Sequence, residues 1–187
     1  MGLYSFGQPQ GGVIQTAYVV QDIHTAMETW RARLNVGPWF LLDHFTGEDG
    51  VYRGEPALAD ISIAMAFAGH MQIELLQPND DHPSVYKEVI GSRGYGFHHF
   101  GKSSMDYAAD LKAYQALGYE LAFEAKVPSG GLVGYLDTKG DMPGFLELIE
   151  DTPGLDEMFT SFYRASLAWD GSDPIRSMMT GEPLRES

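Results

Sequence analysis

The chain of 187 residues is long enough for one sizeable hydrophobic core but short for two ordinary domains, so we expect a single domain over residues 1–187. Its 26 acidic residues outnumber its 12 Lys and Arg residues, and the resulting formal charge of −14 repels nucleic acid and anionic membranes. The lack of cysteine excludes disulfides, thiolate metal sites and cysteine nucleophiles, which leaves His, carboxylate and amide side chains as metal ligands.

The sequence carries neither a membrane-spanning segment nor a secretory signal. No apolar run approaches the length of a membrane span, and residues 1–12 lack the basic segment and apolar stretch of a signal peptide. We therefore expect a soluble, cytoplasmic protein whose partners include neither nucleic acid nor a membrane.

The first half of the chain predicts a strand, a helix and three more strands. Residues 13–20 are rich in β-branched and aromatic side chains, which favours a strand. Asp22 is a suitable N-cap for a helix over residues 23–36, which ends before Gly37 and the proline after it. Three apolar stretches follow, with a polar loop after the first, and they predict antiparallel strands at residues 38–45, 57–69 and 70–78.

The second half repeats this order after a linker at residues 79–95, which contains a short helix near residues 84–92. Asp106 is again placed as the N-cap of a helix. The predicted elements are a strand at 96–104, a helix at 107–118 and strands at 119–127, 131–138 and 145–151.

The residues beyond the second half predict one more helix. Leu155, Met158, Phe159 and Phe162 recur at a spacing of three to four residues, which indicates an amphipathic helix within residues 155–171. The last stretch, 172–187, contains turn formers without periodicity, so we expect it to be extended or partly mobile.

Aligning the two halves on their helix caps places four polar residues at equivalent positions. When Asp22 is laid on Asp106, a shift of 84 residues, Gln15 coincides with His99. At the other end of each half, the similar stretches 72–78 and 145–153 place Glu74 on Glu147 with a shift of 73 residues.

Two adjacent histidines, His98 and His99, lie in the first predicted strand of the second half. Neighbouring residues of a strand point to opposite faces of the sheet, so at most one of the two can serve a given cavity. The alternation places His99 with Phe97 and Gly101 on one face, and His98 with Phe100 on the other.

The repeated strand, helix and three-strand order, over about residues 12–153, resembles the vicinal oxygen chelate superfamily. That superfamily includes glyoxalase I, methylmalonyl-CoA epimerase, extradiol dioxygenases and bleomycin-resistance proteins. The resemblance implies an α+β fold in which two tandem βαβββ modules form a curled mixed sheet around a central cleft, followed by a C-terminal helix. The modules then span residues 12–78 and 96–153, and the C-terminal helix and tail span 154–187.

The resemblance also implies a metal ligand from the first and the last strand of each module. These positions are Gln15, Glu74, His99 and Glu147, which selects His99 over His98 as the ligand and leaves His98 a structural role. Glu74 and Glu147 have apolar neighbours, and a carboxylate is costly to bury there unless it is paired or bound to a cation. An oxygen-rich set with one imidazole suits Mg²⁺, Mn²⁺, Co²⁺, Ni²⁺ or Zn²⁺ without selecting among them.

Local motifs point to two members of the superfamily. The stretches 73–78 and 83–101 look like the corresponding run of methylmalonyl-CoA epimerase, whereas the Gln, Glu, His, Glu ligand set is that of glyoxalase I from higher organisms. The epimerase usually has His where this chain has Gln15. Val19 and Pro78 stand where the resemblance to glyoxalase I calls for Arg and Asn, so neither named substrate can be transferred to this chain.

The relatives share a mechanism in which a carbonyl compound chelates the metal and a carboxylate takes the neighbouring proton. The resemblance therefore implies a metal-dependent isomerase, epimerase or lyase that works through an enolate, with Glu147 as the candidate base and Glu74 as the second. The alternative is a metal-free protein that binds a hydrophobic or aromatic small molecule. An extradiol dioxygenase usually needs two His and one carboxylate for its iron, and Gln15 breaks that pattern.

A cluster of aromatic residues predicts the wall that binds the substrate. Trp39, Phe40, Phe45 and Tyr52 lie close together in the chain, and core packing accounts for about half of this region. The remainder would suit an aromatic, steroid-like or acyl substrate. We expect this small-molecule substrate as the main partner and a homodimer as the assembly.

Overall fold

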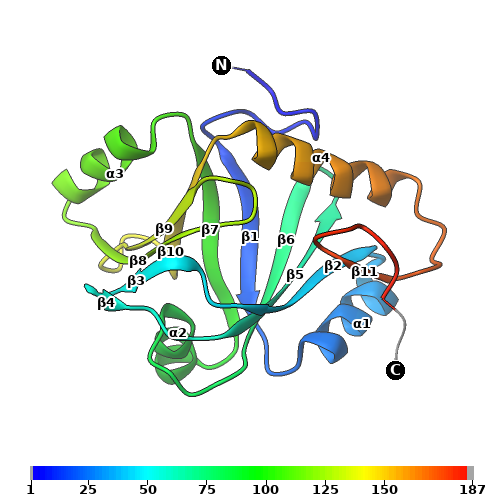
Figure 1. The fold of residues 1–187 in the computed structure, drawn as a ribbon, viewed down its shortest axis with the longest axis horizontal. Coiled ribbons are helices and arrows are strands. Elements are labelled where there is room, and N and C mark those ends of the chain that lie inside the picture. Colours follow the sequence, from blue (N-terminus) through cyan, green and yellow to red (C-terminus); the bar gives the residue numbers. More distant parts are fainter. Residues whose placement is uncertain (1, 185–187) are drawn as a thin grey trace.

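The computed structural model describes residues 2–184 and repeats the same order of elements twice (Figure 1). The first module comprises β1 (Val13–Val19), α1 (Ile23–Leu34), β2 (Trp39–Phe45), β5 (Ile61–Ala68) and β6 (Met71–Pro78). The linker helix is α2 (Val85–Arg93), and the second module comprises β7 (Gly96–Ser104), α3 (Tyr107–Ala116), β8 (Glu120–Lys126), β9 (Leu132–Asp137) and β10 (Phe145–Glu150). The remaining elements are β3 (Glu48–Tyr52), β4 (Glu55–Pro56), α4 (Pro153–Leu167) and β11 (Ile175–Ser177).

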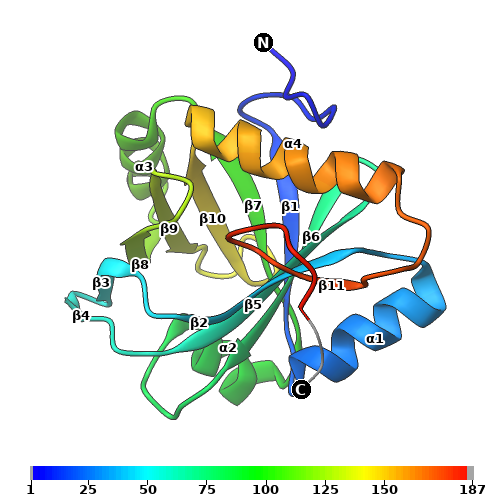
Figure 2. The same ribbon diagram turned by 45° about the vertical axis from the view of Figure 1, so that its right-hand side comes forward.

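The strands form one curled, unclosed mixed sheet with a C-terminal helix, which confirms the predicted fold class. Their order is β11-β2-β5-β6-β1-β7-β10-β9-β8-β3-β4. The strands β1 and β7 pair antiparallel at the centre, and each pairs in parallel with the last strand of its own module, β6 or β10. The first and last strands of both modules therefore lie side by side, and α4 crosses them on the side toward which the sheet curls (Figure 2).

The helix caps form as the sequence predicted. The Asp22 carboxylate accepts a hydrogen bond of 2.6 Å from the Thr25 backbone N–H, and Asp106 accepts one of 3.0 Å from Ala109. The helices α1 and α3 pack on the outer face of the sheet, where they cover two smaller apolar clusters. A larger cluster lies on the inner face and includes Phe159 of α4.

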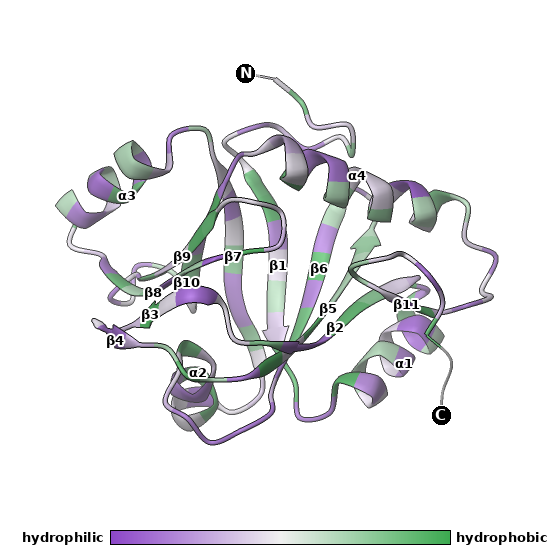
Figure 3. Ribbon diagram, viewed as in Figure 1, coloured by the Kyte–Doolittle hydropathy of each residue, from purple (hydrophilic) through white to green (hydrophobic). Residues whose placement is uncertain are grey.

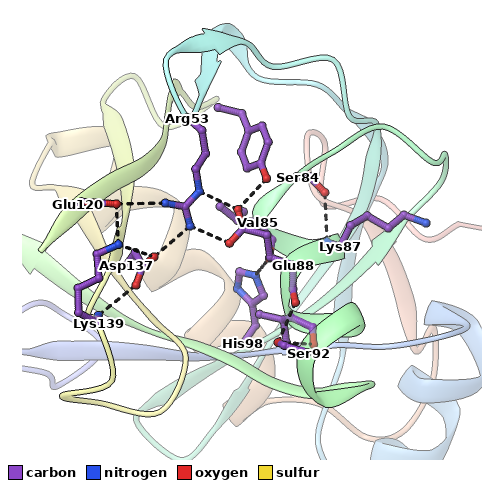
Figure 4. A network of polar contacts seen from close by, with 12 residues as sticks. Arg53, Ser84, Val85, Lys87, Glu88, Ser92, His98, Glu120, Asp137 and Lys139 are labelled. Atoms are coloured by element: carbon purple, nitrogen blue, oxygen red, sulfur yellow. Dashed lines mark hydrogen bonds and ion pairs between the residues drawn. The ribbon is translucent and has the colours of Figure 1, made fainter.

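The stretch between β2 and β5, predicted to be a polar loop, instead forms the hairpin β3–β4. Its strand β3 pairs with β8 of the other module, because β8 otherwise offers an unpaired edge. Arg53, in the turn, extends the attachment with ion pairs to Glu88 of α2 at 2.8 Å and to Asp137 of β9 at 3.0 Å (Figure 4).

Part of the tail is extended, as expected, and this part packs on the rest of the protein. Within it, β11 pairs in parallel with β2, and Met178 is buried against the inner cluster. The expectation for residues 185–187 lies outside the described residues. Among residues 2–184, no helix combines the length and the apolar character that a membrane crossing requires.

Candidate metal centre

Four polar side chains from the four central strands converge on the inner face of the sheet. They belong to β1, β6, β7 and β10, and hydrophilic positions stand out within three of these strands, β1, β6 and β7, in Figure 3. All four are buried, with exposed fractions between 0% and 4%, and they are the predicted ligands Gln15, Glu74, His99 and Glu147. Strand order brings them together, since the positions matched by the internal repeat fall on adjacent strands.

Gly101 of β7 leaves the space in which these side chains meet. In the sheet register it lies opposite Gln15 on one side and Glu147 on the other. A Cβ atom at this position would approach the Gln15 Cβ to 2.8 Å and the Ile149 Cδ1 to 2.9 Å, closer than side chains normally pack. A glycine is therefore required between the two candidate ligands.

The polar atoms of the four side chains lie within a few ångströms of one another. Gln15 Nε2 donates a hydrogen bond of 2.7 Å to Glu74 Oε2 and lies 3.3 Å from His99 Nε2. His99 Nε2 lies 3.0 Å from Glu147 Oε2 and 3.5 Å from Glu74 Oε2. Glu74, His99 and Glu147 each offer one ligand atom within 4.8 Å of the others, which is the spacing of ligands around one cation.

The state of Glu147 indicates that the group fits a divalent cation. Its Oε2 atom is buried and has no hydrogen-bond partner among the described residues, although it lies 3.0 Å from His99 Nε2. Neighbouring ligands of an octahedral ion with bonds of about 2.1 Å are themselves about 3.0 Å apart. A cation between the two atoms would satisfy both, and Gln15 would join them once its amide turned to present Oε1.

Burial sets the charges of these groups. Desolvation raises the pKa of Glu147 to about 8, and the neighbouring Tyr135 hydroxyl opposes that shift. The pKa of Glu74 also rises well above its usual value, first through burial and then through the proximity of Glu147. Desolvation lowers the pKa of His99 to about 3. The protein alone therefore favours neutral side chains here, and a bound cation would favour the ionised carboxylates instead.

A β-bulge in β7 changes the faces that simple alternation assigned to the two histidines. Ala17 pairs with His99 and Tyr18 pairs with Phe97, so His98 is an extra residue in β7. Phe97 lies on the outer face, with its ring 4.7 Å from that of Phe100, and does not share a face with His99 as predicted. The His98 ring is instead buried beside Tyr86, Tyr135 and Phe145, at centroid distances of 5.1 to 5.5 Å.

An apolar cavity of about 60 Å³ adjoins the four polar side chains. Among the described residues, Gln15, Glu74 and Glu147 are the only strongly polar groups in its wall, which otherwise contains few polar side chains and no Lys or Arg. Its other walls come from both modules, from α4 and from the tail, and include Leu42, Phe45, Ile63, Met65, Tyr86, Phe123, Val133, Tyr135, Ile149, Leu155, Met158, Phe159 and Met178.

Of the four aromatic residues predicted to bind substrate, Phe45 reaches this cavity and the other three do not. Trp39 is fully buried on the outer face, 6.2 Å from the ring of Trp30, because alternation along β2 turns it toward α1. Phe40 stacks at 3.9 Å on Phe162 of α4. Tyr52 donates a hydrogen bond of 2.7 Å to Glu88 of α2.

Tyr135 and Tyr86 are polar residues of this site that the sequence patterns did not reveal. Tyr135 pairs with Glu147 in the β9–β10 register, and its ring lies 4.9 Å from that of His99. Only knowledge of that register could have linked Tyr135 to Glu147. Tyr86 comes from the linker helix, which the internal repeat does not contain.

Residues 14–135 match the sequence profile of the family described as the Glyoxalase/Bleomycin resistance protein/Dioxygenase superfamily. This match covers more than half of the chain. The protein therefore belongs to this superfamily, the vicinal oxygen chelate proteins that its sequence resembles. No protein with a curated description matches the chain.

Solved structures with the same fold include methylmalonyl-CoA epimerases. The enzyme from Mycobacterium tuberculosis has a TM-score of 0.57 and 19% identity over 78% of this chain and 91% of its own. A methylmalonyl-CoA epimerase in complex with methylmalonyl-CoA and NH4+ has a TM-score of 0.58 and 16% identity over 78% of this chain and 97% of its own. A hypothetical protein from Bacillus halodurans has a TM-score of 0.56 and 18% identity over 75% of this chain and 94% of its own.

Proposed function

We propose that the protein is a divalent-metal-dependent isomerase, epimerase or lyase that moves a proton on the carbon beside a carbonyl group. The observation that carries this proposal is the buried Oε2 of Glu147, which has no hydrogen-bond partner among the described residues. That atom lies 3.0 Å from His99 Nε2, and Glu147 is one of the residues that line the apolar cavity. A divalent ion bound by Gln15, Glu74, His99 and Glu147 would supply Lewis-acid polarisation of the substrate carbonyl.

Glu147 is better placed than Glu74 to act as the base. Both carboxyl groups line the cavity, but Glu74 Oε2 already accepts a hydrogen bond from Gln15. Glu147 Oε2 accepts no hydrogen bond from the described residues, so a Glu147 carboxylate released from the cation would take a proton from substrate carbon and return it. In the metal-free site burial raises the pKa of Glu147 to about 8, and a bound cation would lower it toward the range that serves proton transfer near neutral pH. In an epimerase, Glu74 would deliver the proton on the opposite face.

The cavity restricts the part of the substrate beside the reacting carbon. Residues 2–184 contribute no Lys or Arg to its walls, so that part should be uncharged and apolar. A volume of about 60 Å³ holds only a few water molecules, so a substrate larger than this must displace side chains of the cavity wall. The fold shared with methylmalonyl-CoA epimerases makes acyl-CoA thioesters the first compounds to test.

Deuterium uptake in D₂O tests this function directly. Metal-loaded protein would be incubated with acyl-CoA thioesters, 2-oxoaldehyde thiol adducts and aromatic ketones, and exchange would be followed by mass spectrometry. We expect uptake into at least one class, and Glu147→Gln should reduce its rate by roughly 10²–10⁴-fold. Glu28→Gln, at an exposed position on α1, is the matched control and should exchange normally.

The apolar wall of the cavity also supports a second candidate, a metal-free binding protein for a hydrophobic or aromatic molecule. Tight binding of such a molecule by chelator-treated protein, with no deuterium uptake by the metal-loaded form, would favour this candidate over the enzyme.

A further inference from the structure

His98 makes two polar contacts although its ring has no exposed surface. Its Nε2 lies 3.3 Å from the backbone oxygen of Val85, at the start of α2. Its Nδ1 lies 2.8 Å from Nδ1 of His99. Figure 4 shows the ring pointing from β7 toward this turn of α2. The two contacts link a backbone carbonyl to a candidate metal ligand.

From this arrangement we infer that His98 is a positioning residue, which holds His99 in the tautomer whose Nε2 carries a lone pair toward the candidate metal centre. This inference concerns the metal centre of the proposed function and rests on it. The sequence predicted only a structural role for His98. Here His98 must accept a hydrogen bond from His99 Nδ1, because only then is His99 Nε2 available to bind a metal.

The direction follows from the donors and acceptors available. A carbonyl oxygen only accepts, so the hydrogen of His98 must be on Nε2. A neutral imidazole has one N–H, so His98 Nδ1 is an acceptor and His99 Nδ1 must be the donor. His99 Nε2 is then left without a hydrogen. The His98 ring is fully buried and its two polar contacts are a carbonyl and an imidazole, with no carboxylate among them, so the ring is neutral.

The surroundings of His99 Nε2 are consistent with a lone pair at that atom. The amide nitrogen of Gln15, which is a donor, lies 3.3 Å away. The contact of 3.0 Å with Glu147 Oε2 lacks the geometry of a hydrogen bond, since that oxygen has no partner among the described residues. The lone pair of His99 Nε2 and an ionised Glu147 Oε2 at this separation are complementary to a cation placed between them.

The start of α2, which carries the carbonyl that His98 contacts, is held in place by other interactions. Ser84 caps α2 by accepting a hydrogen bond of 3.3 Å from the Lys87 backbone N–H. One turn along, Glu88 forms an ion pair of 2.8 Å with Arg53 of the β3–β4 turn (Figure 4). The bulge in β7 places both histidine rings on the inner face of the sheet, and aromatic side chains surround the ring of His98. The geometry therefore leaves His98 little freedom to turn.

Nitrogen NMR of the histidines tests the inference without metal or substrate. In chelator-treated protein labelled with ¹⁵N, we expect His99 to carry its hydrogen on Nδ1 and His98 to carry its hydrogen on Nε2. A His99 hydrogen on Nε2 would overturn the inference. The expected tautomers together with no metal binding would instead contradict the proposed function, so the two failures are distinguishable.

Two substitutions at His98 separate positioning from packing. His98→Phe keeps an aromatic ring but accepts no hydrogen bond, and it should weaken Zn²⁺ or Co²⁺ binding by roughly 10–100-fold. His98→Gln retains an acceptor and a donor and should recover most of that affinity. Equal affinity of His98→Phe and wild-type protein for Zn²⁺ or Co²⁺ would refute the inference. If His98→Phe does not fold, the histidine tautomers measured by NMR in the wild-type protein still test the inference. His70→Phe, which also removes an imidazole contact to a backbone oxygen, is the control.

Discussion

Replacing Glu147 by glutamine should stabilise the metal-free protein while it weakens metal binding. Burial raises the pKa of this carboxyl from 4.5 to about 8, so folding at neutral pH forces the group to take up a proton that the unfolded chain releases. Glutamine has nearly the same shape and carries no ionisable group, so it removes most of this cost. The same change removes a candidate ligand, so stability and affinity should move in opposite directions.

The magnitude follows from the shift in pKa. Each unit corresponds to roughly 1.4 kcal/mol, so at about pH 7.5 the cost of burying Glu147 is on the order of 4 kcal/mol. Some of that cost remains in a buried amide, and we expect Glu147→Gln to gain roughly 2–4 kcal/mol. Below pH 4.5, the pKa of this carboxyl in the unfolded chain, Glu147 is protonated in both the folded and the unfolded protein, and its contribution to stability is fully present. That contribution is lost as the pH rises toward about 8, the pKa in the folded protein.

Urea unfolding followed by circular dichroism, in the presence of EDTA, measures this effect. Wild type should lose stability between about pH 5 and about pH 8, and Glu147→Gln should lose much less. Glu28→Gln, at an exposed position, should follow the wild-type curve. A variant that is less stable than wild type at the higher pH, or that has the same pH dependence, would refute the reasoning.

Three further predictions concern the metal, the space around it and the assembly. Metal affinity should rise between about pH 5 and about pH 8, because the carboxyl groups of Glu74 and Glu147 must lose their protons to bind the ion. Calorimetry in buffers of different ionisation enthalpy measures the protons released on binding. A metal affinity that does not change with pH would count against the site. Gly101→Ala should cost roughly 1–3 kcal/mol in unfolding free energy and weaken metal binding, since its Cβ would lie 2.8 Å from that of Gln15. A normal affinity in this variant would mean that Gln15 is no ligand. Light scattering should give twice the mass of 20.6 kDa if the expected homodimer forms, whereas a monomer mass would contradict it.

Local patterns in the sequence were sufficient to predict the repeated elements and to pair the four central polar residues. Helix caps such as Asp22 and Asp106 act on N–H groups three residues away, so their signal is contained in a short stretch of chain. The equivalence of Gln15 with His99 depends only on counting from those caps. Resemblance to the superfamily then supplied the strand order that brings such positions together, because sequence spacing alone does not specify which strands are neighbours.

Tertiary structure decided the features that depend on register and on distant segments. The bulge at His98, which turns both histidines inward, is a shift between β1 and β7 that strict alternation cannot represent. Phe45 reaches the cavity and Trp39 does not, because a register irregularity near the end of β2 changes which side chains face inward. The cavity is lined in part by α4 and Met178, whose packing against the strands depends on contacts between residues far apart in the chain.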